Sequence, residues 1–104
     1  MKLVRDLIPR IIEENGKSCV YHVAGDTEYK RSLFEKMREE LEEFIENPCY
    51  EEAADMYEVL RTICELHELD MCGVQSVAND KREQRGGFKD KVVLEAVSEK
   101  NESR

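Results

Sequence analysis

The sequence has 104 residues, of which 40% are hydrophobic and 38% charged, and its formal net charge is −8. This length and composition predict one domain over residues 1–104 with a small core, so self-association is expected. The negative balance disfavours nucleic-acid binding, and the absence of a long apolar run or signal peptide favours a cytoplasmic protein without membrane contact.

The first predicted helix begins behind Asp6. Ile8, Ile11 and Ile12 lie at helical spacing, and Asn15-Gly16 is a typical stop signal. Residues 18–23 have extended character, but a strand of this length is stable only beside a partner strand. They are therefore interpreted as a connection or one small strand.

The second predicted helix follows Gly25, with Asp26 or Thr27 as its cap, and runs to about Glu46. Asn47-Pro48 then predicts an asparagine cap with proline at the first position of a third helix, which runs to about Asp70. A connection this short makes the two helices antiparallel neighbours.

Two more helices are predicted downstream, one over residues 74–85 that ends at Gly86-Gly87 and one from about Lys89 to Glu99. Residues 98–104 form a polar tail that is expected to fray. The predicted fold is all-α, an oligomeric bundle of about four to five helices around an antiparallel helix hairpin.

Acidic residues are concentrated in the middle of the chain, where residues 33–70 hold 13 acidic against 3 basic side chains. Glutamates on helices ordinarily form a solvated face. At about 100° per residue, however, Glu40 lies at the edge of the apolar stripe of the second helix, Glu52 lies inside that of the third, and Asp55 lies at its border. Carboxylates in such positions must be paired, protonated or bound to a cation.

Antiparallel pairing predicts that these carboxylates meet. Facing residues in a hairpin keep a nearly constant sum of residue numbers, which sets Glu43 level with Glu52 and Glu40 level with Asp55. Four converging carboxylates repel one another unless divalent cations offset their charge. Oxygen ligands alone favour Mg²⁺, or Mn²⁺ as a substitute.

Basic residues downstream are candidates for phosphate binding. Lys81 and Arg85 lie one helical turn apart, whereas Arg82 projects away from them. Ammonium and guanidinium groups neutralise phosphate oxygens, although the helix dipole alone also favours basic residues at the end of a helix.

The four cysteines lack C-x-x-C spacing and are expected to be reduced thiols. Cys64, His67 and Cys72 lack the paired spacing and the fourth ligand of a zinc site. Ordinary core packing is the favoured interpretation of these side chains.

The acidic pairs and their context resemble the MazG-like branch of the all-α nucleotide pyrophosphohydrolases, which includes the phosphoribosyl-ATP pyrophosphohydrolases. The family signature, E-x-x-E on one helix and E-x-x-D on the next, is matched by ELEE at residues 40–43 and EAAD at residues 52–55. KMREE at 36–40 is similar to the usual lead-in, KREQRGGF at 81–88 to the phosphate-contacting segment, and KLVRDLIP at 2–9 to the start of small phage and bacterial members. The similarity covers residues 2 to about 94.

This resemblance implies Mg²⁺-dependent hydrolysis of a nucleoside triphosphate to the monophosphate and pyrophosphate, in an enzyme that removes noncanonical or surplus nucleotides. It implies a homodimer or homotetramer with sites near subunit contacts. The expected metal ligands are Glu40, Glu43, Glu52 and Asp55, the expected pyrophosphate contacts are Lys81, Arg82 and Arg85, and Glu39 is the candidate to orient the attacking water. The preferred base stays open, because the chain lacks a clear set of aromatic or amide residues for base recognition.

Three alternatives remain open at this point. One is hydrolysis of phosphoribosyl-ATP on the same fold. Another is a catalytically inactive helical module that binds nucleotide or a partner helix. The third is an acidic interaction protein whose glutamates are solvated.

Overall fold

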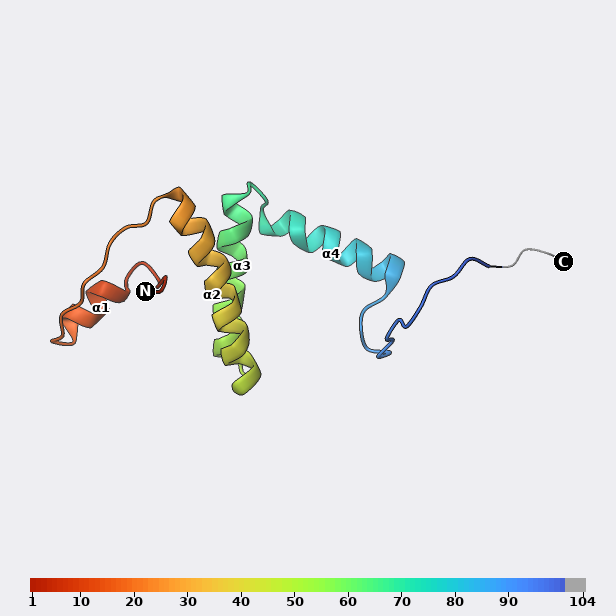
Figure 1. Ribbon diagram of the computed structural model, residues 1–104, viewed down its shortest axis with the longest axis horizontal. Coiled ribbons are helices and arrows are strands. Elements are labelled where there is room, and N and C mark those ends of the chain that lie inside the picture. Colours follow the sequence, from red (N-terminus) through yellow and green to blue (C-terminus); the bar gives the residue numbers. More distant parts are fainter. Residues whose placement is uncertain (101–104) are drawn as a thin grey trace. The chain divides into compact units, whose positions relative to one another are not determined.

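The computed structural model describes residues 1–100, which contain four helices and no strand (Figure 1). The chain divides into two compact units, Met1–Met71 and a second that begins at Cys72, and each is described by itself. The expectation of an all-α chain is confirmed, whereas a single domain over residues 1–104 stays a prediction. Residues 101–104 of the tail expected to fray lie outside the described residues. Over the described part, no helix has both the length and the apolar character needed to cross a membrane.

The first unit opens with α1, Ile8–Glu14, which carries a proline in its first turn. Gly16 ends the helix in the left-handed conformation, with φ +80°. The Gly16 N–H donates to the Glu13 carbonyl at 3.0 Å and the Lys17 N–H to the Ile12 carbonyl at 3.2 Å, which satisfies two carbonyls of the last turn. Residues 17–25 then connect to the next helix without regular secondary structure, so 18–23 is a connection rather than a strand.

The long helices α2, Asp26–Glu46, and α3, Tyr50–Leu66, pack side by side as an antiparallel hairpin (Figure 1). Leu33 from α2 and Val59 and Cys64 from α3 are 3%, 8% and 7% exposed. These are the buried hydrophobic side chains of residues 1–100. The core is therefore a narrow seam along the hairpin.

The turn between α2 and α3 differs from the prediction. Asn47 is not the cap of α3 but the last capping residue of α2, since its N–H donates to the Glu43 carbonyl at 3.0 Å. Pro48 disfavours a helical conformation in the residue before it, and Asn47 is accordingly non-helical with φ −144° and ψ 79°. Cys49 precedes α3, which begins at Tyr50. At the start of α2, Gly25 is the cap rather than Asp26 or Thr27.

Helix α3 ends at Leu66 rather than near Asp70 because Glu68 adopts a left-handed conformation with φ 60°. The Leu69 N–H donates to the Cys64 carbonyl at 2.8 Å and the Glu68 N–H to the Glu65 carbonyl at 3.0 Å. These two bonds satisfy carbonyl groups in the last turn of the helix, as is typical where a left-handed residue ends it. The chain then re-enters helix at Met71, earlier than predicted.

The second unit contains most of α4, Met71–Arg85, which ends as predicted at Gly86 with φ +84°. The predicted last helix from Lys89 to Glu99 is wrong, because residues 86–100 contain no helix. Lys91 has φ 62°, and the apolar residues 92–94 are 76–84% exposed. A short segment without a packed apolar face lacks the tertiary contacts that stabilise most protein helices.

Candidate metal centre

Three carboxylates meet between α2 and α3. Glu40, Glu52 and Asp55 each offer one oxygen atom, and these atoms lie within 4.8 Å of one another. Glu40 also belongs to a second group of the same spacing, with Glu39 and Glu43. Both groups offer carboxylate oxygens alone, the ligand type that hard divalent ions such as Mg²⁺ prefer.

Helix geometry explains this convergence. A spacing of three residues places Glu40 and Glu43 on neighbouring turns of α2, and Glu52 and Asp55 on neighbouring turns of α3. Antiparallel packing of the two helices then brings the α3 pair to Glu40. Glu43 is exposed and falls in the group with Glu39 and Glu40 rather than in the group with both α3 residues.

The Glu40 carboxylate is buried and only half satisfied. Glu40 is 4% exposed, and its Oε1 lies 3.1 Å from the Lys36 Nζ. Its Oε2 and the Oε2 of Glu52 are buried and lack a hydrogen-bond partner within the described part of the chain. A buried carboxylate oxygen without a partner costs free energy, and a bound cation offsets that cost. The two oxygens are therefore candidate ligand atoms for a cation.

The crowded charge changes proton affinities at the site. The pKa of Glu43 is raised above its ordinary value of 4.5, first because its protonated form can donate a hydrogen bond to Glu40, and then because the charge of Glu40, desolvation and the charge of Glu52 disfavour its ionised form. Burial lowers the pKa of the Lys36 ammonium group, but its hydrogen bonds to Glu40 and Glu39 and their charges outweigh burial and raise it. Lys36 thus stays protonated beside the two carboxylates.

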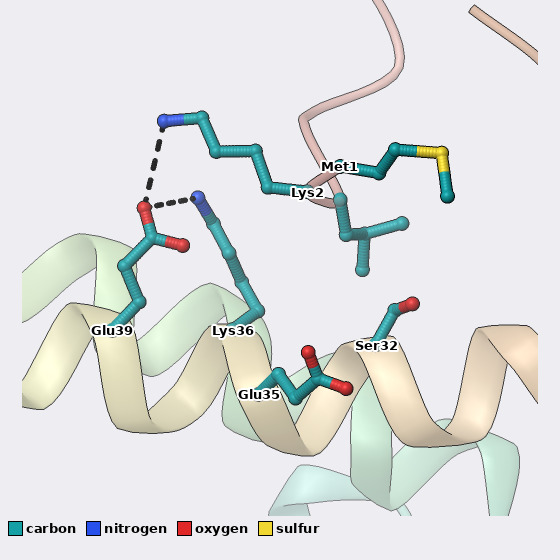
Figure 2. Close-up of a pocket in the computed structure, with 7 residues that line it drawn as sticks. Met1, Lys2, Ser32, Glu35, Lys36 and Glu39 are labelled. Atoms are coloured by element: carbon teal, nitrogen blue, oxygen red, sulfur yellow. Dashed lines mark hydrogen bonds and ion pairs between the residues drawn. The ribbon is translucent and has the colours of Figure 1, made fainter.

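Two cations from the start of the chain also reach the carboxylates. The Arg5 Nη2 donates to the Asp55 Oδ1 at 2.8 Å. The Lys2 Nζ lies 3.6 Å from the Glu39 Oε1, to which Lys36 also points from 3.5 Å (Figure 2). The sequence-based prediction missed both roles. The sequence does place these two cations three residues apart, within the segment 2–9 that carries the family resemblance. No local pattern, however, indicates that Arg5 contacts a residue 50 positions further along the chain.

A pocket of about 200 Å³ lies beside this cluster, between the start of the chain and one face of α2 (Figure 2). It shares Lys36 and Glu39 with the carboxylate site. Its lining is Met1, Lys2, Leu3, Ser32, Glu35, Lys36 and Glu39. The pocket therefore adjoins the carboxylate cluster at Glu39.

The predicted phosphate-binding residues belong to the second unit. Lys81, Arg82 and Arg85 are exposed on the C-terminal part of α4, and Lys81 and Arg85 lie one helical turn apart. Their exposure leaves the three charges available to an anion. Their assignment to substrate phosphate stays a prediction.

Comparison of the chain with models of protein families, with curated proteins and with solved structures found no match in any of the three. The functional interpretation therefore depends on the sequence motifs and on the carboxylate site. Of that site, the buried oxygens of Glu40 and Glu52 are the most specific feature.

Proposed function

We propose that this protein is a Mg²⁺-dependent nucleotide pyrophosphohydrolase of the MazG-like type, which converts a nucleoside triphosphate or a related nucleotide to the monophosphate and pyrophosphate. The observation that carries the proposal is the buried Glu40 carboxylate. One of its oxygens is paired with Lys36, the other lacks a partner in the described chain, and the residue belongs to the cluster with Glu52 and Asp55. The E-x-x-E and E-x-x-D spacing of the resemblance supports the same residues.

The ion is held in this proposal by Glu40, Glu52 and Asp55, with Glu43 at the exposed edge. Their oxygens suit Mg²⁺, and Mn²⁺ as a substitute. When bound, such an ion polarises phosphate oxygens and lowers the pKa of a coordinated water. The Lys36 ammonium group holds the Glu40 carboxylate in place, so Lys36 acts as a positioning residue.

Glu39 is the proposed residue for orienting the attacking water. Its side chain is 31% exposed and is held by Lys2 and Lys36, which fixes a partly solvated carboxylate next to Glu40. Lys81, Arg82 and Arg85 are proposed to offset the charge of the leaving pyrophosphate, as cations do in other phosphoryl transfers.

We also propose that the chain acts in the cytoplasm as a homodimer or homotetramer. Phe34, Leu41 and Ile45 follow the helical period along one face of α2 and are 47%, 45% and 67% exposed. On α3, Tyr57 and Leu60 are 49% and 39% exposed. A hairpin with a core of three hydrophobic side chains in the described residues gains stability when a second copy covers such faces.

The decisive experiment is a panel of nucleoside triphosphates incubated with Mg²⁺ and scored for products. Monophosphate with pyrophosphate is expected, because the attack falls on the α-phosphorus. Diphosphate with phosphate would contradict the proposed bond. Cleavage of phosphoribosyl-ATP alone would assign the related activity, and nucleotide binding without turnover would indicate an inactive module.

Glu52→Gln tests the site itself. The variant keeps the size of the side chain but removes the charge of a half-buried ligand, so turnover is expected to fall by at least about 100-fold with helicity unchanged. Helicity is checked by circular dichroism. Glu51→Gln, at the exposed neighbouring position, is the control and is expected to keep wild-type turnover. Retained activity in Glu52→Gln would overturn the site assignment.

A further inference from the structure

We propose that Arg5 binds a phosphate group of the substrate at this site. The inference rests on the proposed function, because it takes the ligand of the site to be a polyphosphate held with a divalent ion. It assigns phosphate binding to a residue of the first unit that the sequence-based prediction did not include.

Arg5 is placed at the ion site by direct contact. Its Nη2 donates to the Asp55 Oδ1 at 2.8 Å, and Asp55 offers an oxygen within 4.8 Å of oxygens of Glu40 and Glu52. A phosphate oxygen bound to an ion among these carboxylates would therefore lie near the guanidinium group. The contact spans 50 residues, so tertiary packing and not local helix geometry brings Arg5 there.

The exposure of the pair leaves Arg5 accessible to a ligand. The side chains of Arg5 and Asp55 are 57% and 39% exposed. A guanidinium group carries five N–H donors in a planar fork, and the contact with Asp55 uses Nη2. The remaining donors suit the oxygens of a phosphate group, which arginine binds through two parallel hydrogen bonds.

The charge balance of the site indicates when Arg5 would exchange Asp55 for a phosphate group. The two clusters of acidic residues together contain five carboxylates. Three of these carboxylates are paired with cations, namely Lys2, Arg5 and Lys36. The two negative charges left over match one divalent ion. An ion held by Asp55 would compete with the guanidinium group for this carboxylate, and a polyphosphate would supply a replacement anion for Arg5.

Lys36 does not have this freedom. Its side chain is 17% exposed and bound to both Glu39 and Glu40, so it holds the ligands in place. Lys2 is 68% exposed but pairs with Glu39 over the longer distance of 3.6 Å. Of the three cations, Arg5 makes the closest contact to an expected metal ligand, and it is far more exposed than Lys36.

The test measures two affinities by calorimetry, for Mg²⁺ alone and for inorganic tripolyphosphate in the presence of Mg²⁺. In Arg5→Ala, tripolyphosphate is expected to bind about tenfold more weakly or worse, because a charge-assisted hydrogen bond is lost. Mg²⁺ alone is expected to bind no more weakly than in the wild type, because the group that pairs with Asp55 is gone. Arg5→Lys, which keeps the charge but not the fork, is expected to bind tripolyphosphate with intermediate affinity.

Arg61→Ala is the matched control. Arg61 pairs with Glu58 at 2.9 Å with side chains 46% and 39% exposed, much like Arg5 and Asp55, but Glu58 belongs to neither carboxylate group. This variant is expected to bind both ligands as the wild type does. The comparison separates a role in phosphate binding from the loss of any surface ion pair.

Two results would overturn the proposal. Unchanged tripolyphosphate binding in Arg5→Ala would make the contact with Asp55 a surface ion pair only. Weakened binding of both Mg²⁺ and tripolyphosphate would assign Arg5 a purely structural role. If the wild type releases pyrophosphate while Arg5→Ala matches it in both titrations, this inference fails and the proposed function stands. If the wild type binds neither ligand, the proposed function itself fails.

Discussion

Glu40 shows how one buried side chain makes the hairpin costly to maintain without a cation. Its pairing with Lys36 satisfies one oxygen, and the other remains buried without a partner in the described chain. Buried ion pairs seldom stabilise a fold more than apolar residues of similar size, since both charges must leave water. The pair is therefore not expected to stabilise the fold by itself, and the proposed ion site gives the unpartnered oxygen a role.

Glu43 gives a pH dependence at the scale of one residue. The pKa of Glu43 in the folded state lies above the ordinary 4.5. Between these two pKa values, the native protein therefore holds a proton on Glu43 that the unfolded chain releases. The contribution of Glu43 to the free energy of unfolding is therefore greatest below the ordinary value and is lost as the pH rises through the raised pKa. Glu43→Gln has no titrating group at this position. Its free energy of unfolding is therefore expected to fall less than that of the wild type as the pH rises through the raised pKa.

Urea unfolding with a metal chelator, at intervals from about pH 4 to pH 7, measures this difference. Glu42→Gln, at the exposed adjacent position, is the control and is expected to follow the wild type. Added Mg²⁺ is expected to shrink the difference, because a bound cation favours the ionised carboxylate. A wild-type curve parallel to that of Glu43→Gln would show that Glu43 carries no such coupling.

At the scale of helices, the residue that stops α3, two positions beyond its end at Leu66, is poorly suited to its backbone conformation. Glu68 has φ 60°, where a side chain beyond glycine crowds the backbone. Glu68→Gly is expected to raise the free energy of unfolding by about 1 kcal/mol, as measured by urea denaturation. Glu65→Gly, inside α3, should lower it by up to about 1 kcal/mol, because glycine weakens a regular helix. Destabilisation by both changes would show that Glu68 is not strained.

The same helix end shows what sequence reasoning could and could not predict. The period of apolar residues predicted α2, α3 and the hairpin they form, because the pattern reflects the buried face directly. Local signals also predicted the stops at Gly16 and Gly86. The end at Leu66 has no such signal, because a glutamate there adopts the conformation that glycine usually takes. No helix forms after Lys89, because a helix there would need tertiary contacts for its apolar face, and the sequence pattern does not show whether such contacts exist.

The candidate site follows the same division. The convergence of Glu40 with Glu52 and Asp55 could be predicted, because spacing within each helix and pairing between them place the three carboxylates. The burial of Glu40 against Lys36 and the contact of Arg5 with Asp55 could not. Both depend on how individual side chains and the non-helical start of the chain pack against the hairpin. The period of apolar residues does not predict such contacts.

At the scale of the whole molecule, the exposed apolar faces of the hairpin lead to the last prediction. Leu41, near the middle of the exposed α2 face, is 45% exposed. If a second copy covers this face, Leu41→Gln removes apolar area that the partner would bury, worth about 1 kcal/mol per copy, which raises the dissociation constant by about fivefold or more. Sedimentation over a range of concentrations measures it. Glu42→Gln, which places the same side chain at the next exposed position, is expected to leave assembly unchanged. A wild type that sediments as a monomer at every concentration would contradict self-association through this face.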